Sequence, residues 1–300
     1  MIGWTSDAAA KIGEVLSEAA MKQTLFPVSS RCRFSVLCGL IGLILLALPS
    51  APALAGGPPP FLPGEKLTFQ LRWGVIPAGE ATLEVLPPRI VDGKRAQHFV
   101  LTARTNSFLD VFYKIRQRID AYPDLGLNRS LLYKEVHTVG HRKRDARIVF
   151  DWEHMEARYI NFGQVKKQVA LDPGALDPLS VFYYSRMFDP SRHPVLERPV
   201  TDGEKCVIGR AAFVGRESLR VQGKTYDTFL IEPELKEVGG VFEKSKDAKI
   251  QIWVTADHRR IPVRLRSKVA IGSFTGDLVS VETPAQGRLF YSSRRQRVVP

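Results

Sequence analysis

The segment KLTFQLRW, residues 66–73, alternates apolar and polar side chains with a period of two. Its apolar members all carry odd numbers: Leu67, Phe69, Leu71 and Trp73. Successive side chains of a β-strand point to opposite faces, so the pattern predicts a strand with one buried face. The alternation resumes at residues 80–85 after the sequence Gly74-Val75-Ile76-Pro77, which predicts a hairpin.

Segments of the same kind recur along the chain, separated by turns. Asp92-Gly93 is typical of a tight hairpin turn, because both residues tolerate positive φ angles. The other expected strands cover residues 99–103, 113–122, 130–139, 144–151, 155–160, 166–171, 206–214, 217–222, 226–231, 249–255, 260–270 and 273–281. Short strands without long helices between them predict a mainly β fold, a strongly curved antiparallel sheet or an open or closed β-barrel.

One segment, DPLSVFYYSRMF at residues 177–188, departs from the strand pattern. Asp177 is a good N-cap and Pro178 suits the first helical position. The apolar residues that follow have helical spacing: Leu179, Phe182, Tyr183 and Met187. The segment is expected to form one helix that covers apolar surface of the sheet.

Residues 22–55 have the composition of a cleavable export signal. Lys22, Arg31 and Arg33 precede an apolar run at residues 34–48, and Ala53-Leu54-Ala55 follows it. The run has 15 residues, whereas a permanent membrane helix needs about 20. We expect translation to start at Met21, cleavage after Ala55 and a periplasmic location, with an uncleaved anchor as the alternative.

The remaining chain is expected to contain a Gly/Pro linker at 56–63, a single β-rich domain at 64–283 and a basic, frayed tail at 284–300. Only Cys206 follows the leader, so no intramolecular disulfide is available. The net charge of +12 favours anionic partners, which outside the cytoplasm are lipid headgroups, lipopolysaccharide, acidic glycan or cell wall rather than nucleic acid.

Several short motifs follow one another in a set order. They are Gly64-Glu65-x-Leu67, Trp73 with Ala78-Gly79, Phe150-Asp151, Asp177-x-Leu179-Ser180 with Tyr183-Tyr184, and Trp253-Val254-Thr255-x-Asp257 followed by Pro262-Val263. On these residues the chain resembles the bacterial exported family known as domain of unknown function 3108, over residues 60–283. The resemblance implies an exported β-rich protein and brings no catalytic residues. A looser likeness to periplasmic lipoprotein carriers, in which a helix covers the cavity of an incomplete barrel, concerns the fold alone.

The aromatic residues of the expected helix are the main candidates for ligand contact. They could line a pocket for an acyl chain, since barrels of eight or more strands can hold a small ligand. They could equally complete the core, and the sequence leaves both interpretations open. The candidates are Phe182, Tyr183, Tyr184 and Phe188, with Trp73 and Trp253 from the strands.

Two rows of basic residues are candidates for anion contact. Positions i and i+2 of a strand share a face about 7 Å apart, so each row could meet phosphates or a membrane surface. A solvated face that keeps strand edges from pairing is the plainer interpretation. The rows are Arg260, Arg264, Arg266 and Lys268, and Lys114, Arg116 and Arg118; a third basic set is Arg142, Lys143, Arg144 and Arg147.

No catalytic or metal motif is apparent. His137 and His141 would lie about 13 Å apart in extended chain, too far to share a metal, so neither a metal nor a cofactor is expected. The hypothesis is a non-enzymatic periplasmic binding or carrier protein for an amphipathic, anionic ligand such as a lipid or a lipopolysaccharide-like molecule. The alternatives are a structural envelope protein that docks a protein partner and an enzyme acting on wall or glycan. The oligomeric state stays open.

Overall fold

The computed structural model describes residues 59–112, 114–140, 142–234, 249–269 and 272–283. The expected signal peptide, the cleavage after Ala55 and the basic tail lie outside these residues. The strands are β1 (Lys66–Trp73), β2 (Ile76–Val91), β3 (Lys94–Thr105), β4 (Ile115–Pro123), β5 (Ser130–Val139), β6 (Arg142–Asp151), β7 (Glu156–Asn161), β8 (Gln164–Ala170), β9 (Val195–Thr201), β10 (Cys206–Val221), β11 (Lys224–Pro233), β12 (Lys249–Thr255), β13 (Pro262–Val269) and β14 (Gly272–Glu282). The helices are α2 (Ser107–Asp110) and α3 (Pro178–Arg186).

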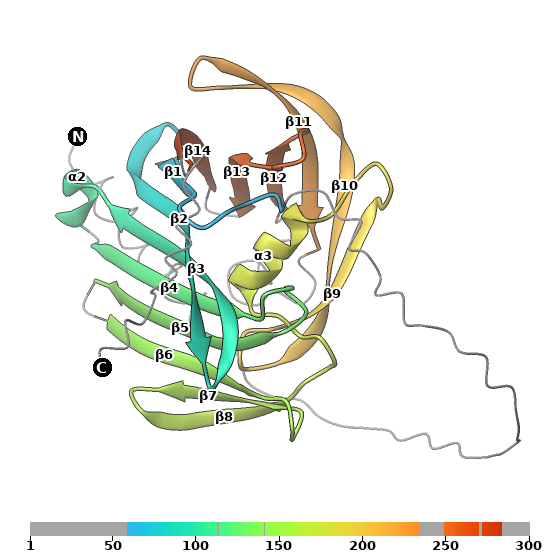
Figure 1. Ribbon diagram of the computed structural model, residues 1–300. Coiled ribbons are helices and arrows are strands. Elements are labelled where there is room, and N and C mark those ends of the chain that lie inside the picture. The colour runs from blue at the N-terminus through green and yellow to red at the C-terminus, as the bar shows by residue number, and fades with distance from the viewer. Residues whose placement is uncertain (1–58, 113, 141, 235–248, 270–271, 284–300) are drawn as a thin grey trace, which may run out of the picture.

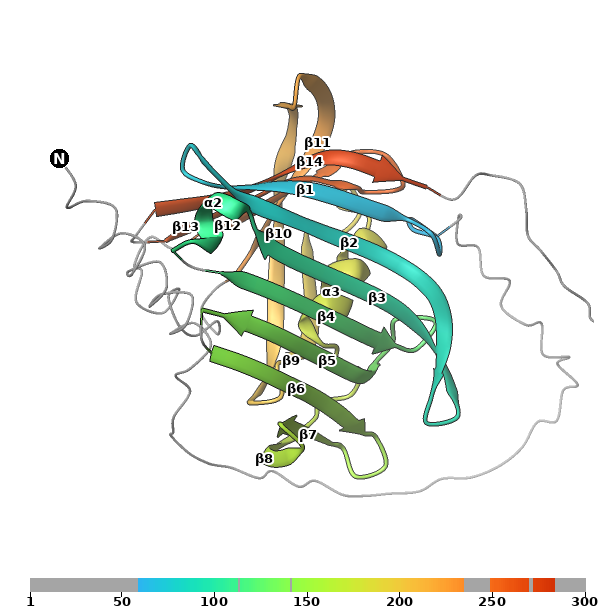
Figure 2. The same ribbon diagram turned by 90° about the vertical axis from the view of Figure 1, so that its left-hand side faces the viewer.

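All fourteen strands of the described residues form one antiparallel sheet in the order β8-β7-β6-β5-β4-β3-β2-β1-β14-β13-β12-β11-β10-β9. The first eight strands pair in chain order, the last six do the same, and β14 pairs with β1 to join the two sets. The sheet curls around α3, and its free edges are β8 and β9 (Figures 1 and 2). The predicted curved antiparallel sheet with one covering helix is confirmed, and the sheet is open.

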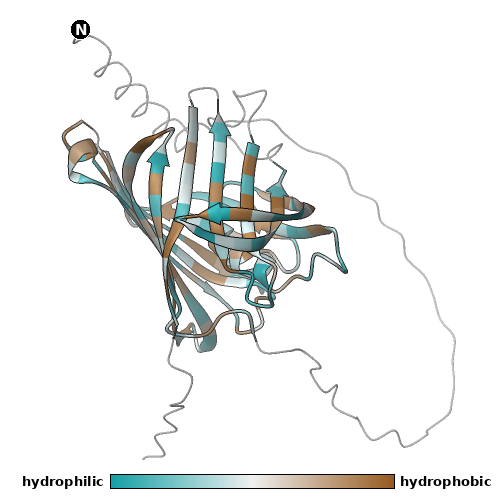
Figure 3. Cartoon of the chain, turned by 90° about the horizontal axis from the view of Figure 1, so that it is seen from above, coloured by the Kyte–Doolittle hydropathy of each residue, from teal (hydrophilic) through white to brown (hydrophobic). Residues whose placement is uncertain are grey.

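The strand registers follow the alternation seen in the sequence. Leu67 lies opposite Leu83 and Phe69 opposite Ala81 in the β1–β2 pair, so the apolar side chains of both strands lie on one face of the sheet. Polar and apolar residues alternate along strands in Figure 3. The predicted turn between β2 and β3 is confirmed, with φ of 47° at Asp92 and 74° at Gly93.

The structure differs from the expected elements in several places. Residues 206–221 form the single strand β10, in which a register shift between Phe213 and Gly215 stands where the sequence suggested a break. The edge strand β9 was missed because it contains Pro199, which cannot donate to a ladder. The four-residue α2 was also missed, although the Asn106 side chain caps it by accepting from Leu109 N.

The start of β13 also differs from the expectation. Arg260 has a φ of 43° and precedes the strand, so it does not continue the row that begins at Arg264. Pro262 follows at a register shift in the β12–β13 pair, which agrees with the expected bulge. Because the bulge turns the backbone there, the i, i+2 rule does not place Arg260 on the same face as Arg264.

The helix α3 is fixed at its start by a buried polar cluster. The Asp177 carboxylate accepts from the backbone N–H groups of Leu179 and Ser180 at 3.0 and 2.8 Å, which confirms the predicted N-cap. It also accepts from the hydroxyls of Ser130 and Ser180 at 2.5 and 2.6 Å. Since Ser130 begins β5, the cap joins the helix directly to the sheet.

Burial raises the pKa of Asp177, against the opposing effect of hydrogen bonds from Ser130, Ser180 and Leu179. A carboxyl with a raised pKa in the folded state contributes stability that is lost as the pH rises from its unfolded pKa through the folded one. We therefore expect the Asp177→Asn variant, which cannot titrate, to gain stability relative to the wild type as the pH rises above 3.8. Urea unfolding of both proteins at several pH values measures this. A stability difference that is independent of pH would contradict it.

The other end of α3 is fixed by a buried ion pair. Arg186 Nη1 lies 2.6 Å from Glu65 Oε1, and the two side chains are 0% and 2% exposed. Arg186 also donates to the carbonyl oxygens of Pro60 and Arg259. Phe61 is buried against Tyr183, so Pro60 and Phe61 of the expected linker are buried, whereas Leu62 is 49% exposed. Within the described residues, no helix is long and apolar enough to cross a bilayer.

Candidate ligand-binding surface

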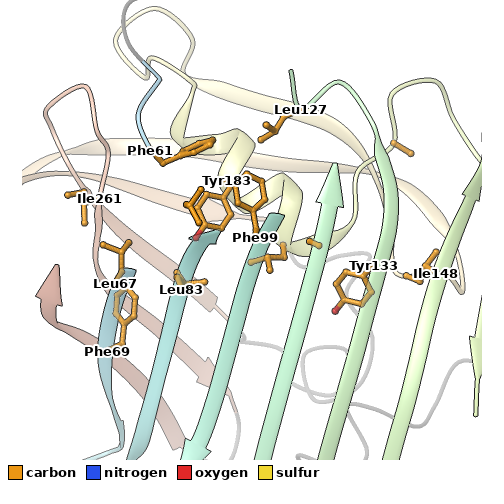
Figure 4. Close-up of a cluster of buried hydrophobic side chains, with 14 of the residues drawn as sticks. Phe61, Leu67, Phe69, Leu83, Phe99, Leu127, Tyr133, Ile148, Tyr183 and Ile261 are labelled. Atoms are coloured by element: carbon orange, nitrogen blue, oxygen red, sulfur yellow. The ribbon is translucent and has the colours of Figure 1, made fainter. Parts of the chain in front are cut away.

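The concave surface consists of the side chains of the sheet that face α3. Its first row lies beneath the helix and comes from four neighbouring strands. In this row Phe99, Ala121, Tyr133 and Ile148 lie opposite one another in β3, β4, β5 and β6. All four are buried, at 8% exposure or less. Figure 4 shows this part of the surface, with Tyr183 of the helix packed on Phe99.

Tyr183 fills the space between the helix and the sheet. Its ring stacks on Phe99 with a centroid distance of 3.9 Å and meets Phe61 edge-on at 5.2 Å. It is 0% exposed. Its hydroxyl oxygen is buried and has no hydrogen-bond partner among the described residues. The space directly under α3 is therefore packed by the protein's own rings.

The structure does not gather the helix aromatics at one place. Phe182 is half-buried and meets Tyr183 edge-on at 5.8 Å. Tyr184 lies under the Arg198 guanidinium of β9, and Phe188 packs beside Tyr184 and His193. Met187, expected on the covered face, is 45% exposed because it follows the helix as its C-cap. Tyr184 and Phe188 thus belong to the contact with β9.

The two tryptophans of the candidate set lie apart from this cluster. Trp73 ends β1 and stacks on Phe274 of β14, with a centroid distance of 6.5 Å. Trp253 of β12 is 7% exposed, and its indole N–H donates to Glu217 of β10. Trp253 therefore packs in the core, whereas Trp73 lies at the end of β1 beside Phe274.

The second row of the concave surface lies two residues further along the strands and is less buried. Leu101 of β3 lies opposite Ile119 of β4, and both are half-buried. Further half-buried apolar side chains border the same core: Ala81, Leu230 and Leu265. A helix of nine residues is about 14 Å long, whereas strands of 10 to 12 residues extend about 34–40 Å. Since α3 contacts β3, β4 and β9, it covers one part of the concave surface only.

The third row is polar, and of its members only Arg144 was among the basic residues considered from the sequence. Gln117 of β4, His137 of β5 and Arg144 of β6 lie opposite one another, on the same face as the first row. Gln117 Nε2 donates to Glu135 Oε1 at 2.9 Å, and His137 Nδ1 lies 3.0 Å from the same oxygen. From the sequence, His137 was considered only together with His141, which lies outside the described residues. The missed signal is that Glu135 and His137 stand at odd-numbered positions of β5, where the other side chains are apolar.

Tyr159 of β7 completes this polar cluster. Arg144 Nε and Nη2 both lie within hydrogen-bond distance of the Tyr159 hydroxyl, at 2.9 and 2.6 Å. Arg144 Nη1 is 3.8 Å from Glu135 Oε2, beyond hydrogen-bond distance. Burial raises the pKa of Glu135, but the hydrogen bond from His137 and the charge of Arg144 outweigh it and hold that pKa below its ordinary value. Glu135 is therefore ionised at neutral pH.

The predicted rows of basic residues are largely paired with carboxylates. Arg116 pairs with Asp110, whose pKa falls to about 2 through hydrogen bonds from Arg116 and Thr105. Arg118 pairs with Asp120, and Arg264 donates to Asp277 at 2.5 Å. Four members of the rows are exposed: Lys114, Arg118, Arg266 and Lys268. Arg260 donates to carbonyl oxygens of Arg186 and His258.

No group of three or more histidine, cysteine, aspartate or glutamate side chains within the described ranges could hold a metal ion. Glu135 and His137 form a two-residue contact, and the remaining members of the polar cluster are Gln117, Arg144 and Tyr159. Guanidinium and phenol groups are not the usual ligands of zinc or calcium. The chemistry that this cluster offers is hydrogen bonding to a polar group.

Comparisons with known proteins give one family and several solved structures. A family model described as a protein of unknown function, DUF3108, matches residues 68–279. A β-barrel-like DUF1849 protein from Brucella abortus is similar with a TM-score of 0.49 and 10% identity, covering 75% of this chain and 99% of that chain. A protein from Bacteroides fragilis, described as exported and with a YmcC-like fold, has a TM-score of 0.31 and 7% identity over 74% of this chain and 97% of that chain. A protein from Parabacteroides distasonis, described as a lipoprotein, has a TM-score of 0.26 and 9% identity over 74% and 97%. A search of the curated proteins gives no match.

Proposed function

The chain belongs to the DUF3108 family of proteins of unknown function, and from its geometry we propose that it is a periplasmic binding protein whose concave surface holds the acyl chain of an amphipathic ligand. One observation carries the proposal: the apolar concave surface extends beyond the part that α3 covers. There, Leu101 and Ile119 are half-buried, whereas Phe99 and Ala121 beneath the helix are fully buried. The expected export signal supports the periplasmic location.

Burial of an acyl chain is favourable because each CH₂ removed from water contributes about 0.8 kcal/mol. A ten-carbon contact on such a surface would thus offset much of the entropic cost of association. The packed Tyr183 ring limits the ligand to the uncovered part of the concave surface, beyond the first row. The ligand would therefore lie along the second row rather than beneath the helix.

Native mass spectrometry of protein purified from the periplasm of its own cells tests whether it carries an amphipathic molecule. We expect a bound species whose mass is released by organic extraction. Titration of the delipidated protein with 11-dansylaminoundecanoic acid, followed by fluorescence, measures binding directly. A delipidated protein that neither carries a lipid nor takes up this acyl probe contradicts the proposal.

The variant Ile119→Asn places an amide in the second row and is expected to weaken binding of the acyl probe at least 10-fold, because an unpaired amide would meet the chain. Val136→Asn is the matched control. Val136 is 52% exposed and lies on the opposite face of β5 from Tyr133, so its replacement should change the affinity for the acyl probe less than 2-fold. Circular dichroism confirms that both variants are folded. Equal affinity of the Ile119→Asn variant and the wild type for the acyl probe would mean that the acyl chain does not bind over Ile119.

A further inference from the structure

The polar cluster of Gln117, Glu135, His137, Arg144 and Tyr159 has hydrogen-bonding capacity that the protein does not use. The guanidinium of Arg144 carries five N–H donors, and its two contacts with Tyr159 engage only part of them. A Tyr159 oxygen that accepts from the guanidinium directs its own O–H elsewhere. Nη1 of Arg144 is too far from Glu135, at 3.8 Å, to be hydrogen-bonded to it. The cluster therefore has unused donors next to an apolar surface.

Glu135 fixes the orientation of His137. Its Oε1 lies 3.0 Å from Nδ1, so the other ring nitrogen, Nε2, points away from the carboxylate. The carboxylate itself also accepts from Gln117 and is thereby occupied. Arg144 and His137 are direct neighbours in the register of β5 and β6, so the free donors of Arg144 lie beside the His137 ring on one patch.

One further observation separates this cluster from an internal structural network. Its charged side chains are not sealed off from solvent, since those of Arg144, Glu135 and His137 are 21%, 14% and 11% exposed.

We infer that the Arg144 guanidinium and the Tyr159 hydroxyl, beside the His137 ring, form the binding site for the anionic oxygen head group, a carboxylate or a phosphate, of the acyl ligand. The inference rests on the proposed function, because it places the head group of the same ligand. An arginine guanidinium matches the geometry of carboxylate and phosphate oxygens and can bind them through two hydrogen bonds. The head group lies at the third row, and the acyl chain continues over Ile119 and Leu101 of the second.

Displacement of 11-dansylaminoundecanoic acid by dodecanoate, dodecyl phosphate, dodecanol and inorganic phosphate tests the inference. We expect the wild type to bind dodecanoate and dodecyl phosphate at least 10-fold more tightly than dodecanol, because only the first two have an anionic head group. The Arg144→Gln variant should lose this preference while its affinity for dodecanol stays within 2-fold of the wild type. Tyr159→Phe should reduce the preference by a smaller factor.

The control variant is Arg147→Gln. Arg147 lies on the same strand, is exposed and has the opposite parity from Arg144, so its replacement should leave the preference for anionic ligands unchanged. Equal binding of dodecanoate and dodecanol by the wild type would overturn the head-group site and leave the acyl-binding function standing. Tight binding of inorganic phosphate alone would show a free-anion site and overturn the assignment to an acyl ligand. Lack of binding of all twelve-carbon ligands would remove the proposed function itself.

Discussion

Replacement of Arg186 by methionine is expected to lower the free energy of unfolding by about 3–5 kcal/mol, because it leaves the buried carboxylate of Glu65 without its main partner. Both side chains are at most 2% exposed, so water cannot replace the lost contact. The carbonyl oxygens of Pro60 and Arg259 would also lose donors. Urea unfolding followed by tryptophan fluorescence measures the change. Arg259, which lies 3.1 Å from Glu65, limits the loss.

The control for this prediction is Arg192→Met. Arg192 is 80% exposed and pairs with Asp189 only at the surface, so its replacement should change the free energy of unfolding by less than about 0.5 kcal/mol. The double variant Glu65→Gln/Arg186→Met removes the uncompensated charge and should recover part of the lost stability. A loss below 1 kcal/mol in the single Arg186→Met variant would mean that the ion pair does not hold α3 to residues 60–65.

The variant Tyr183→Ala is expected to lower the free energy of unfolding by about 3–5 kcal/mol, the usual cost of removing a large aromatic ring from a packed core. The ring contacts Phe61, Phe99 and Phe182, and these rings come from three separate parts of the chain. Their contacts cannot re-form around an alanine without moving the helix. Phe108→Ala, at a side chain that is 63% exposed, should change the stability by less than about 0.5 kcal/mol.

Tyr183→Phe separates the ring from its hydroxyl. The buried oxygen has no hydrogen-bond partner among the described residues, so its removal should leave the stability unchanged or raise it, because the cost of burying an unpaired polar group is relieved. A loss above 1 kcal/mol would show that the hydroxyl is hydrogen-bonded in solution. Together the two variants measure how much of the contribution of Tyr183 comes from packing.

The sequence predicted the sheet well because its strands alternate strictly. Residues 130–139 and 249–255 form strands with the expected bounds, since both have clear turns or breaks beside them. The cap of α3 was also predictable, because Asp177 and Pro178 are a local signal that needs no knowledge of the fold. Local chemistry thus accounts for the elements and their order.

The tertiary contacts were not predictable in the same way. Arg186 meets Glu65 across 121 residues, and neither residue stands out in its own segment. Tyr183 was expected in a cavity or in the core, and only the stacked Phe99 ring decides that it packs. The polar cluster of Gln117, Glu135, His137, Arg144 and Tyr159 was missed because its five residues come from four strands. The register aligns Gln117, His137 and Arg144, whereas Glu135 and Tyr159 reach them through their side chains.

The pairing of β1 with β14 has a consequence for the order of folding. Each set of strands, β1 to β8 and β9 to β14, is built from hairpins between neighbours in the chain, and such local pairs close quickly. The ladder that joins the sets brings Lys66 opposite Glu282 and requires nearly the whole chain. Loop-closure entropy makes this the costly step. A nascent chain can therefore assemble two separate meanders, but the curved sheet is completed only after the last strand has left the ribosome.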